Sequence, residues 1–215
     1  MFLKEPQPGR VKTRLAQTLG DRAASDVARA CAELLCARLS DYRDEATVCV
    51  HPPEAVARLH AWLGSAWTAQ PQHGATLGER LDRAIGDARR DGAQHVVVIG
   101  TDSPWLAAAD IEQAFEALAS SDVVLGPTED GGYYLIGVRG HWPALFEDID
   151  WSTDRVLQQT LARAERLGLS VQLLRSGYDV DRYEDLQRFL ADAAAADAAP
   201  ALQALMVFKE SRRDR

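Results

Sequence analysis

The sequence is poor in lysine and cysteine and has no long apolar run. Only three of its 24 basic residues are lysines, and Cys31, Cys36 and Cys49 lack the paired spacing of a zinc site. Such an odd set indicates free, buried thiols rather than disulfides. No apolar stretch is as long as a membrane helix, which needs about 20 residues. The first residues are too polar for a signal peptide. We therefore predict a cytoplasmic protein without a membrane span.

The net charge of −8 argues against nucleic acid or an anionic membrane as a partner, because both polyanions would be repelled. Length and composition, 215 residues with 47% hydrophobic and 26% charged, are those of an ordinary globular domain. We expect one domain over residues 1–200, followed by a C-terminal tail over residues 201–215.

Short apolar, β-branched runs alternate with amphipathic stretches. The expected strands are 1–3, 47–51, 95–100, 122–126, 133–137 and 171–174. Apolar stripes with helical spacing comprise residues 27, 31, 34, 35 and 39; 77, 81, 84, 85 and 88; 111, 115 and 118; and 157, 161, 164 and 167. Thr76 and Glu79 form a capping box for the second of these helices. This order predicts the α/β class, as a three-layer α/β/α, Rossmann-like domain with a mostly parallel central sheet.

A basic loop follows the first strand and leads into a helix from about Val11. Pro6 and Pro8 stiffen the turn, and Gly9 permits close approach of a ligand to the backbone. The cationic side chains that would converge on a phosphate are Lys4, Arg10, Lys12 and Arg14. The alternative is a solvated basic turn. The spacing is not that of a Walker P-loop, so a kinase or ATPase is disfavoured.

Acidic loops follow three later strands. Asp102 is expected at the carboxyl edge of the sheet, either as a ligand of Mg²⁺ or Mn²⁺ or as a helix cap. Asp179 and Asp181 have the alternation that would point both at the same metal, or else Asp181 caps the last helix with Glu184.

The remaining acidic loop, at 126–134, contains Asp130, Gly131 and Gly132. Asp130 could accept hydrogen bonds from substrate hydroxyls, and the glycines would permit close approach of the substrate. The alternative is a simple Asp-Gly hairpin turn. Together with the basic loop, the three acidic loops indicate a metal-dependent phosphate or nucleotide site.

The motifs Lys4-x-Pro-x-Pro-Gly-Arg-Val-Lys-Thr-Arg-Leu15, Leu77-Gly-Glu-Arg80, Gly100-Thr-Asp-Ser-Pro104, Glu129-Asp-Gly-Gly-Tyr-Tyr134 and Asp179-x-Asp181 closely resemble the bacterial family called domain of unknown function 2064. That resemblance covers roughly residues 1 to 190. It implies the GT-A fold of nucleotide-diphospho-sugar transferases. More distantly, the pattern is similar to guanylyltransferases of molybdenum cofactor and phospholactate metabolism. Relatives usually have a longer first strand and a more glycine-rich loop.

The resemblance implies roles for individual residues. Lys12 and Asp102 would be catalytic, with Arg10 helping Lys12 to hold phosphates. The metal ligands would be Asp102 and Asp181, and Gln70 with Leu77-Gly78 would read the base. The motif that contains Gly78 also places Arg80 among the substrate-binding residues. Asp130 and Gly132 would face the acceptor or sugar.

The function expected from these observations is a metal-dependent, glycosyltransferase-like transfer from a nucleotide-sugar donor. Three alternatives stay open. One is a nucleotidyltransferase that joins a nucleoside monophosphate from an NTP to a phosphorylated acceptor, the second is a non-catalytic nucleotide-binding module, and the third is hydrolysis of a phosphate ester. The expected partners are a nucleotide or nucleotide-sugar and a small-molecule acceptor of unknown identity, and a homo-oligomer is left open.

Overall fold

The computed structural model describes residues 1–64 and 66–193, which form two compact units. Among the described residues, the β1–β3 unit comprises 3–64, 66–70, 101–107 and 179–193, and the β4–β7 unit comprises 1–2, 71–100 and 108–178. A single domain over 1–200 stays a prediction, and the expected tail at 201–215 lies outside the described residues.

The β1–β3 unit contains a three-stranded sheet in the order β1-β2-β3, namely β1 (Phe2–Lys4), β2 (Thr47–His51) and β3 (Thr68–Pro71). Its helices are α1 (Thr13–Leu19), α2 (Asp21–Arg38), α3 (Val56–Leu63) and α7 (Tyr183–Ala193), with 3-10 turns at Ser40–Tyr42 and Pro53–Ala55. The strands β1 and β2 were expected from the sequence. Neither β3 nor α3 was expected, and β3 lacks an apolar β-branched run.

The helix expected from about Val11 is α1, which begins at Thr13. Gly20, at φ 85°, separates α1 from α2, and such a positive φ favours glycine. The predicted stripe on α2 is confirmed, because residues 27, 31, 34, 35 and 39 are all buried. All three cysteines are buried, and none of them forms a disulfide within the described residues, as expected.

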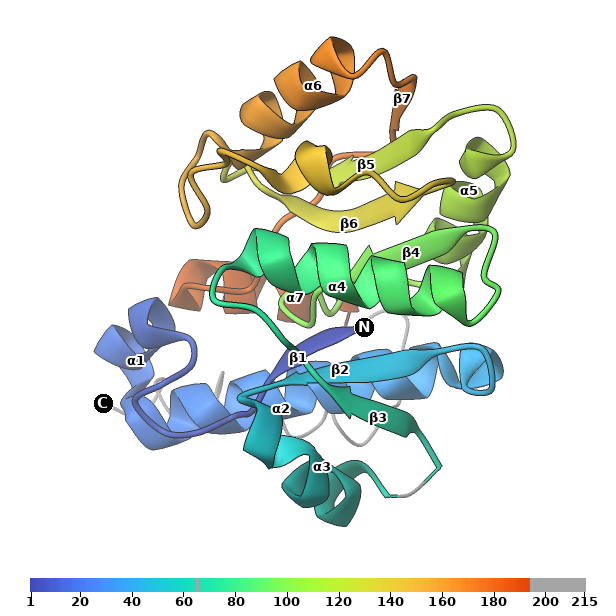
Figure 1. Cartoon of the computed structure of the whole chain (residues 1–215). Coiled ribbons are helices and arrows are strands. Elements are labelled where there is room, and N and C mark those ends of the chain that lie inside the picture. Colours follow the sequence, from blue (N-terminus) through green and yellow to red (C-terminus); the bar gives the residue numbers. More distant parts are fainter. Residues whose placement is uncertain (65, 194–215) are drawn as a thin grey trace. The chain divides into compact units, whose positions relative to one another are not determined.

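The β4–β7 unit contains a four-stranded sheet in the order β4-β6-β5-β7, with β6 between β4 and β5 (Figure 1). The strands are β4 (Val96–Ile99), β5 (Val123–Pro127), β6 (Tyr133–Val138) and β7 (Val171–Leu173), and the helices are α4 (Leu77–Arg90), α5 (Ala108–Leu118) and α6 (Val156–Arg166), with a 3-10 turn at Pro143–Phe146. The pairing of β5 with β7 is parallel, whereas β6 is antiparallel to both its neighbours. The sheet is mixed because β5 returns as β6 through a tight hairpin rather than a helical crossover.

Helices cover both faces of this sheet, which agrees with the expected α/β class. On one face, Val123 and Leu125 of β5 share a buried cluster with residues of α4 and α6. On the other, a side chain on Gly137 of β6 would meet Leu118 of α5 at 3.2 Å and Val124 at 3.5 Å. Glycine therefore allows α5 to lie close to β6.

Three predicted stripe members are exposed instead of buried. Leu77 and Leu167 lie at helix ends, and Phe115 lies on the outer side of α5. None of the helices within residues 1–64 and 66–193 is long and apolar enough to cross a membrane.

Candidate functional site

Lys12 is the residue from which the site is built. It ends the loop after β1, and its carbonyl accepts the first hydrogen bond of α1, from Ala16 at 2.9 Å. Its backbone has φ 44° and ψ 48°, a left-handed conformation that is uncommon for residues other than glycine. Strained backbone of this kind clusters at functional sites. The side chain, only 2% exposed, is held inside the protein rather than in solvent.

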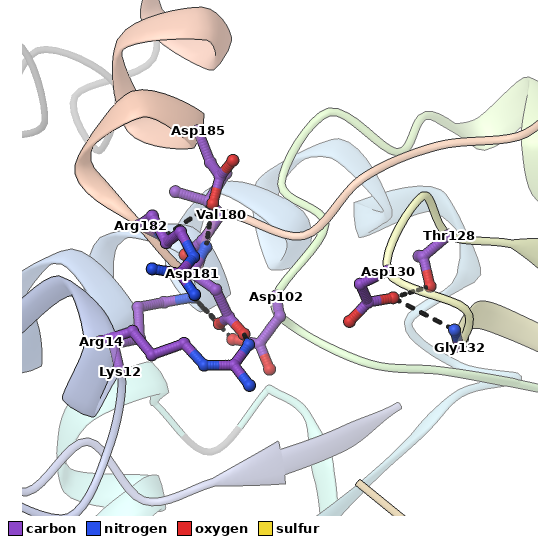
Figure 2. Close-up of polar contacts among 10 residues, drawn as sticks. All are labelled: Lys12, Arg14, Asp102, Thr128, Asp130, Gly132, Val180, Asp181, Arg182 and Asp185. Carbon is purple, nitrogen blue, oxygen red and sulfur yellow. Dashed lines mark hydrogen bonds and ion pairs between the residues drawn. The ribbon is translucent and has the colours of Figure 1, made fainter. Parts of the chain in front are cut away.

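The Lys12 ammonium has three oxygen neighbours from two distant segments (Figure 2). It donates to Asp102 Oδ1 at 2.7 Å and to the carbonyl oxygen of Val180 at 2.7 Å. Asp181 Oδ1 lies 3.9 Å away, close enough for an ion pair but not for a hydrogen bond. The carboxylates of Asp102 and Asp181 therefore face the same cation, the Lys12 ammonium.

The pKa values of this pair move in opposite directions. Burial acts to lower the pKa of Lys12, but the negative charges of Asp102 and Asp181 and the hydrogen bond to Asp102 act against it, so the pKa is raised. The positive charge of Lys12 is the main reason that the pKa of Asp102 is lowered, and the charge of Lys4 adds to it. At neutral pH both groups are therefore charged.

Asp102 does not cap the following helix, because α5 begins only at Ala108 and the carboxylate is paired with Lys12. The capping alternative is therefore wrong. The Asp102 side chain is 55% exposed although one of its oxygens binds Lys12. It can therefore offer an oxygen to a ligand.

Asp181 pairs with a second cation of the basic loop. Its Oδ2 lies 3.7 Å from Arg14 Nη1, and its side chain is 37% exposed. At the start of α7, the Asp185 carboxylate accepts from the amides of Asp181 at 3.1 Å and Arg182 at 2.7 Å. The amide of Asp181 is thus bound by Asp185, one residue beyond the expected Glu184.

The contacts described for Asp179 and Asp181 go to different partners. Asp179 Oδ1 accepts a hydrogen bond from the Ser103 hydroxyl at 2.6 Å, whereas the Asp181 carboxylate faces Lys12 and Arg14. In the part of the chain that is described, no group of three or more His, Cys, Asp or Glu residues is arranged to hold a metal ion. The three aspartates therefore do not form a closed metal cage.

The other members of the basic loop are more exposed than Lys12. Lys4, Gly9 and Arg10 are exposed, and Gly9 has φ 76°, where glycine is favoured. Glu5, in the same loop, is bound by two guanidinium nitrogens of Arg58, and this hydrogen bonding lowers the pKa of Glu5. Part of the loop is thus anchored to α3, and the interpretation as a wholly solvated basic turn is wrong for Lys12.

Asp130 closes its own hairpin between β5 and β6. Its Oδ1 accepts from Thr128 Oγ1 at 2.6 Å and from the amide of Gly132 at 3.1 Å, as Figure 2 shows. Gly131 has φ 88°, and a Cβ there would lie 2.1 Å from the carbonyl oxygen of Asp154. The hairpin alternative is thus confirmed, and a role of these three residues toward substrate stays a prediction.

The motif at the start of α4 is packed internally. Thr76 accepts the amide of Glu79 at 3.1 Å, which confirms the predicted cap, and Arg80 Nε donates to the Gly74 carbonyl at 3.0 Å. Gly78 is buried, and a Cβ there would lie 2.8 Å from both the Phe146 carbonyl oxygen and Trp151 Nε1. Packing alone therefore requires glycine here, and the proposed reading of a base by Gly78 is not needed to explain it.

Gln70, the other expected base-reading residue, lies in β3 and donates from Nε2 to Cys49 Sγ on β2 at 3.3 Å. Three residues of the site around Lys12 were not predicted: Ser103, Val180 and Asp185. Ser103 belongs to the sequence motif that contains Asp102, so its position in that motif could have marked it as a site residue. Val180 contributes a backbone carbonyl, for which a sequence contains no signal.

Comparison with known proteins first defines the fold class. The chain matches a crystal structure from Desulfovibrio desulfuricans G20 that is provisionally assigned to the nucleotide-diphospho-sugar transferases. The TM-score is 0.92 at 31% identity, and the match covers 99% of this chain and 95% of that one. The chain therefore has this α/β fold.

The family follows from the sequence match. Residues 34–153, more than half of the chain, match the family described as "Uncharacterized protein conserved in bacteria (DUF2064)". The chain belongs to this family, which confirms the resemblance seen in its motifs.

Two curated relatives have named activities. A phosphoenolpyruvate guanylyltransferase of Chloroflexus aggregans is 31% identical over 123 residues, 53% of this chain and 58% of that protein. One of Sphaerobacter thermophilus is 27% identical over 151 residues, 69% of this chain and 71% of that protein. The match to the first relative thus spans less than two thirds of its length.

Proposed function

We propose that this chain is a nucleotidyltransferase that transfers a nucleoside monophosphate from an NTP to a phosphate group of a small acceptor. The observation that carries the proposal is the Lys12 ammonium, buried and paired with Asp102 at 2.7 Å and Asp181 at 3.9 Å. The names of the two curated relatives support nucleotidyl transfer, with GTP as the donor and phosphoenolpyruvate as the acceptor to test first.

In this reaction an oxygen of the acceptor phosphate attacks the α-phosphorus of the NTP. The bond between the α-phosphorus and the bridging oxygen breaks, and that oxygen leaves with its electron pair as part of pyrophosphate. Negative charge grows on the phosphates, so catalysis depends on fixed positive groups near them. Lys12 supplies such a group, and its raised pKa keeps it protonated at neutral pH.

Lys12 can bind a phosphate oxygen without leaving Asp102. An ammonium has three N–H donors, and two short hydrogen bonds join Lys12 to Asp102 and to the Val180 carbonyl. The third donor is the one that we assign to a phosphate. Arg14, exposed and 3.7 Å from Asp181, is a second group for the phosphates.

The residues fit a divalent ion that arrives with the nucleotide. Mg²⁺ is commonly held by one or two carboxylates together with phosphates and waters, not by an all-protein cage. Asp102 and Asp181 face the same ammonium and are 55% and 37% exposed, so both can offer oxygen to such an ion. Bound there, Mg²⁺ or Mn²⁺ would neutralise charge on the phosphates.

Glycosyl transfer from a nucleotide-sugar is the second candidate. It is favoured by the likeness to the Desulfovibrio protein, which covers 99% of this chain at 31% identity. Inverting glycosyl transfer needs a general base, and we assign none. The two reactions differ in their products, since nucleotidyl transfer releases pyrophosphate and glycosyl transfer releases a nucleoside diphosphate.

The test incubates the protein with each of the four common NTPs, phosphoenolpyruvate or another phosphorylated acceptor, and Mg²⁺ or Mn²⁺. Pyrophosphate release that requires the acceptor supports the proposal. Nucleoside diphosphate release from a nucleotide-sugar supports glycosyl transfer instead, and metal-dependent binding without any product indicates a binding module. Asp102→Asn should lower turnover, while Arg22→Ala, which removes an exposed pair with Asp26 on α2, should not change it.

A further inference from the structure

Two short segments meet beside Lys12, and side-chain and backbone contacts join them. One is residues 101–107, and the other begins at Asp179. The amide of Val180 donates to the carbonyl oxygen of Asp102 at 2.8 Å. The Ser103 hydroxyl donates to Asp179 Oδ1 at 2.6 Å. Each of these contacts lies within one or two residues of a carboxylate that faces Lys12.

The contact between Ser103 and Asp179 is of the strong kind. A hydroxyl that donates to a carboxylate at 2.5 to 2.7 Å is a charge-assisted hydrogen bond, about twice as strong as a neutral one. Ser103 is 2% exposed, so water cannot readily replace the contact. The bond therefore fixes how the two segments lie against each other.

We propose that Ser103 and Asp179 form a positioning clasp that holds Asp102 and Asp181 at the spacing needed to face one cation, and that Asp179 is not itself a metal ligand. Asp179 acts through Ser103, the residue next to Asp102. Val180, between the two aspartates, is fully buried and anchors this segment in the core. The metal and nucleotide part of this inference rests on the function proposed above, whereas the clasp itself does not.

The first test needs neither metal nor nucleotide. Hydrogen exchange of the Val180 amide, which bonds to Asp102, reports whether the segments stay together. Ser103→Ala and Asp179→Ala should each speed this exchange about tenfold, because local opening becomes easier. Asp179→Asn should not, since its amide oxygen can still accept from Ser103. Unchanged exchange in Ser103→Ala would overturn the clasp.

The second test measures the affinity of the protein for Mn²⁺ alone, by titration calorimetry. Loss of a group that orients a metal ligand costs about 10- to 100-fold in metal affinity. We expect at least about a tenfold loss for Ser103→Ala and for Asp179→Ala, and no further loss when both changes are combined. Asp179→Asn should restore most of the affinity. Ser120→Ala, at an exposed serine in the other unit, is the matched control.

Direct ligation by Asp179 gives a different pattern. Asp179→Asn would then lose as much Mn²⁺ affinity as Asp179→Ala, and Ser103→Ala would lose little. Additive losses in the double variant would also contradict the clasp. If the protein transfers no nucleotidyl group, the proposed function fails, while the exchange of the Val180 amide still decides whether the clasp exists.

If the clasp sets the spacing of the carboxylates in the active enzyme, its loss should lower kcat more than it raises KM for the NTP. Ser103→Ala is expected to lower kcat about tenfold, because a shift of a catalytic group by a fraction of an ångström is costly. Thermal unfolding of each variant serves as the check on folding. A change in melting temperature with kcat unchanged would assign the pair to stability alone.

Discussion

Two acidic loops of this chain are held together in different ways. Asp102 binds Lys12, a residue 90 positions away in the sequence, and keeps a side chain that is 55% exposed. Asp130 binds Thr128 and Gly132, each two positions away. The hydrogen bonds of Asp130 lie within its own loop and need no other part of the fold. The pair between Asp102 and a distant, buried lysine forms only in the folded protein. This difference separates a candidate site from a turn.

The largest expected effect is that of Lys12→Met, which breaks the long-range pair. Loss of one fixed donor at charged phosphates typically costs about 100- to 1000-fold in kcat, so pyrophosphate release should fall by at least about 100-fold. The free energy of unfolding should fall by about 1 to 3 kcal/mol, less than for a fully buried pair, because solvent reaches Asp102. Urea titration measures the second effect.

The control for Lys12→Met is Arg22→Met on α2. It breaks an exposed pair with Asp26, whose atoms lie 3.5 Å apart, and should cost less than about 0.5 kcal/mol. A Lys12→Met variant with normal turnover would remove the ground for a phosphate site at this residue.

Gly131→Ala changes the local loop between β5 and β6 that contains Asp130. The alanine Cβ would lie 2.1 Å from the Asp154 carbonyl oxygen, at φ 88°, so both clash and strain oppose it. We expect a loss of about 3 kcal/mol in the free energy of unfolding. Gly92→Ala is the matched control, because its φ is 100° and nothing lies within 4 Å of the added Cβ. Strain alone there should cost about 1 to 2 kcal/mol, and equal losses in the two variants would contradict the clash.

Acid should weaken the long-range pair. The pKa of Asp102 is lower in the folded protein than in the unfolded chain, so its stabilising effect is present above the unfolded value of about 4 and disappears as the pH falls through the folded value. The difference in unfolding free energy between wild type and Asp102→Asn should be about 1 kcal/mol at pH 7, since the group is half exposed. A difference that grows below pH 4 would contradict the pairing.

The smallest expected effects are those at Asp130. Asp130→Ala removes the acceptor of two local hydrogen bonds and should cost about 1 kcal/mol. Asp130→Asn keeps an acceptor oxygen and should stay within about 0.5 kcal/mol of wild type. If Asp130 also binds the acceptor, Asp130→Asn will raise KM for that substrate, and an unchanged KM would restrict Asp130 to the turn.

Local chemistry explains how much of the fold was predictable. Strand β2, over Thr47–His51, matches its predicted range, because four of its five residues are valine, threonine or cysteine in an apolar run. The cap by Thr76 was predictable because its partner Glu79 is three residues away. By contrast, β3 depends on pairing within its sheet rather than on its own sequence, so no local pattern marked it.

The candidate site was predictable in its membership but not in its contacts. Lys12, Asp102 and Asp181 were all expected, because basic and acidic loops follow strands. The sequence could not show that Lys12 binds Asp102 directly, since only the folded chain brings them to 2.7 Å. For the same reason, the alternation of Asp179 and Asp181 suggested a shared metal, whereas Asp179 bonds to Ser103.

The burial of Lys12 also makes its amine a chemical reporter. Reagents that acylate lysine need an accessible, unprotonated amine. The Lys12 side chain is only 2% exposed, and the pKa of its amine is raised. Lys4 is exposed and should react readily. In a chain with only three lysines, mass spectrometry can follow each one separately. Labelling of Lys12 that rises when Asp102 is changed to Asn would reveal the opening of this pair without any substrate.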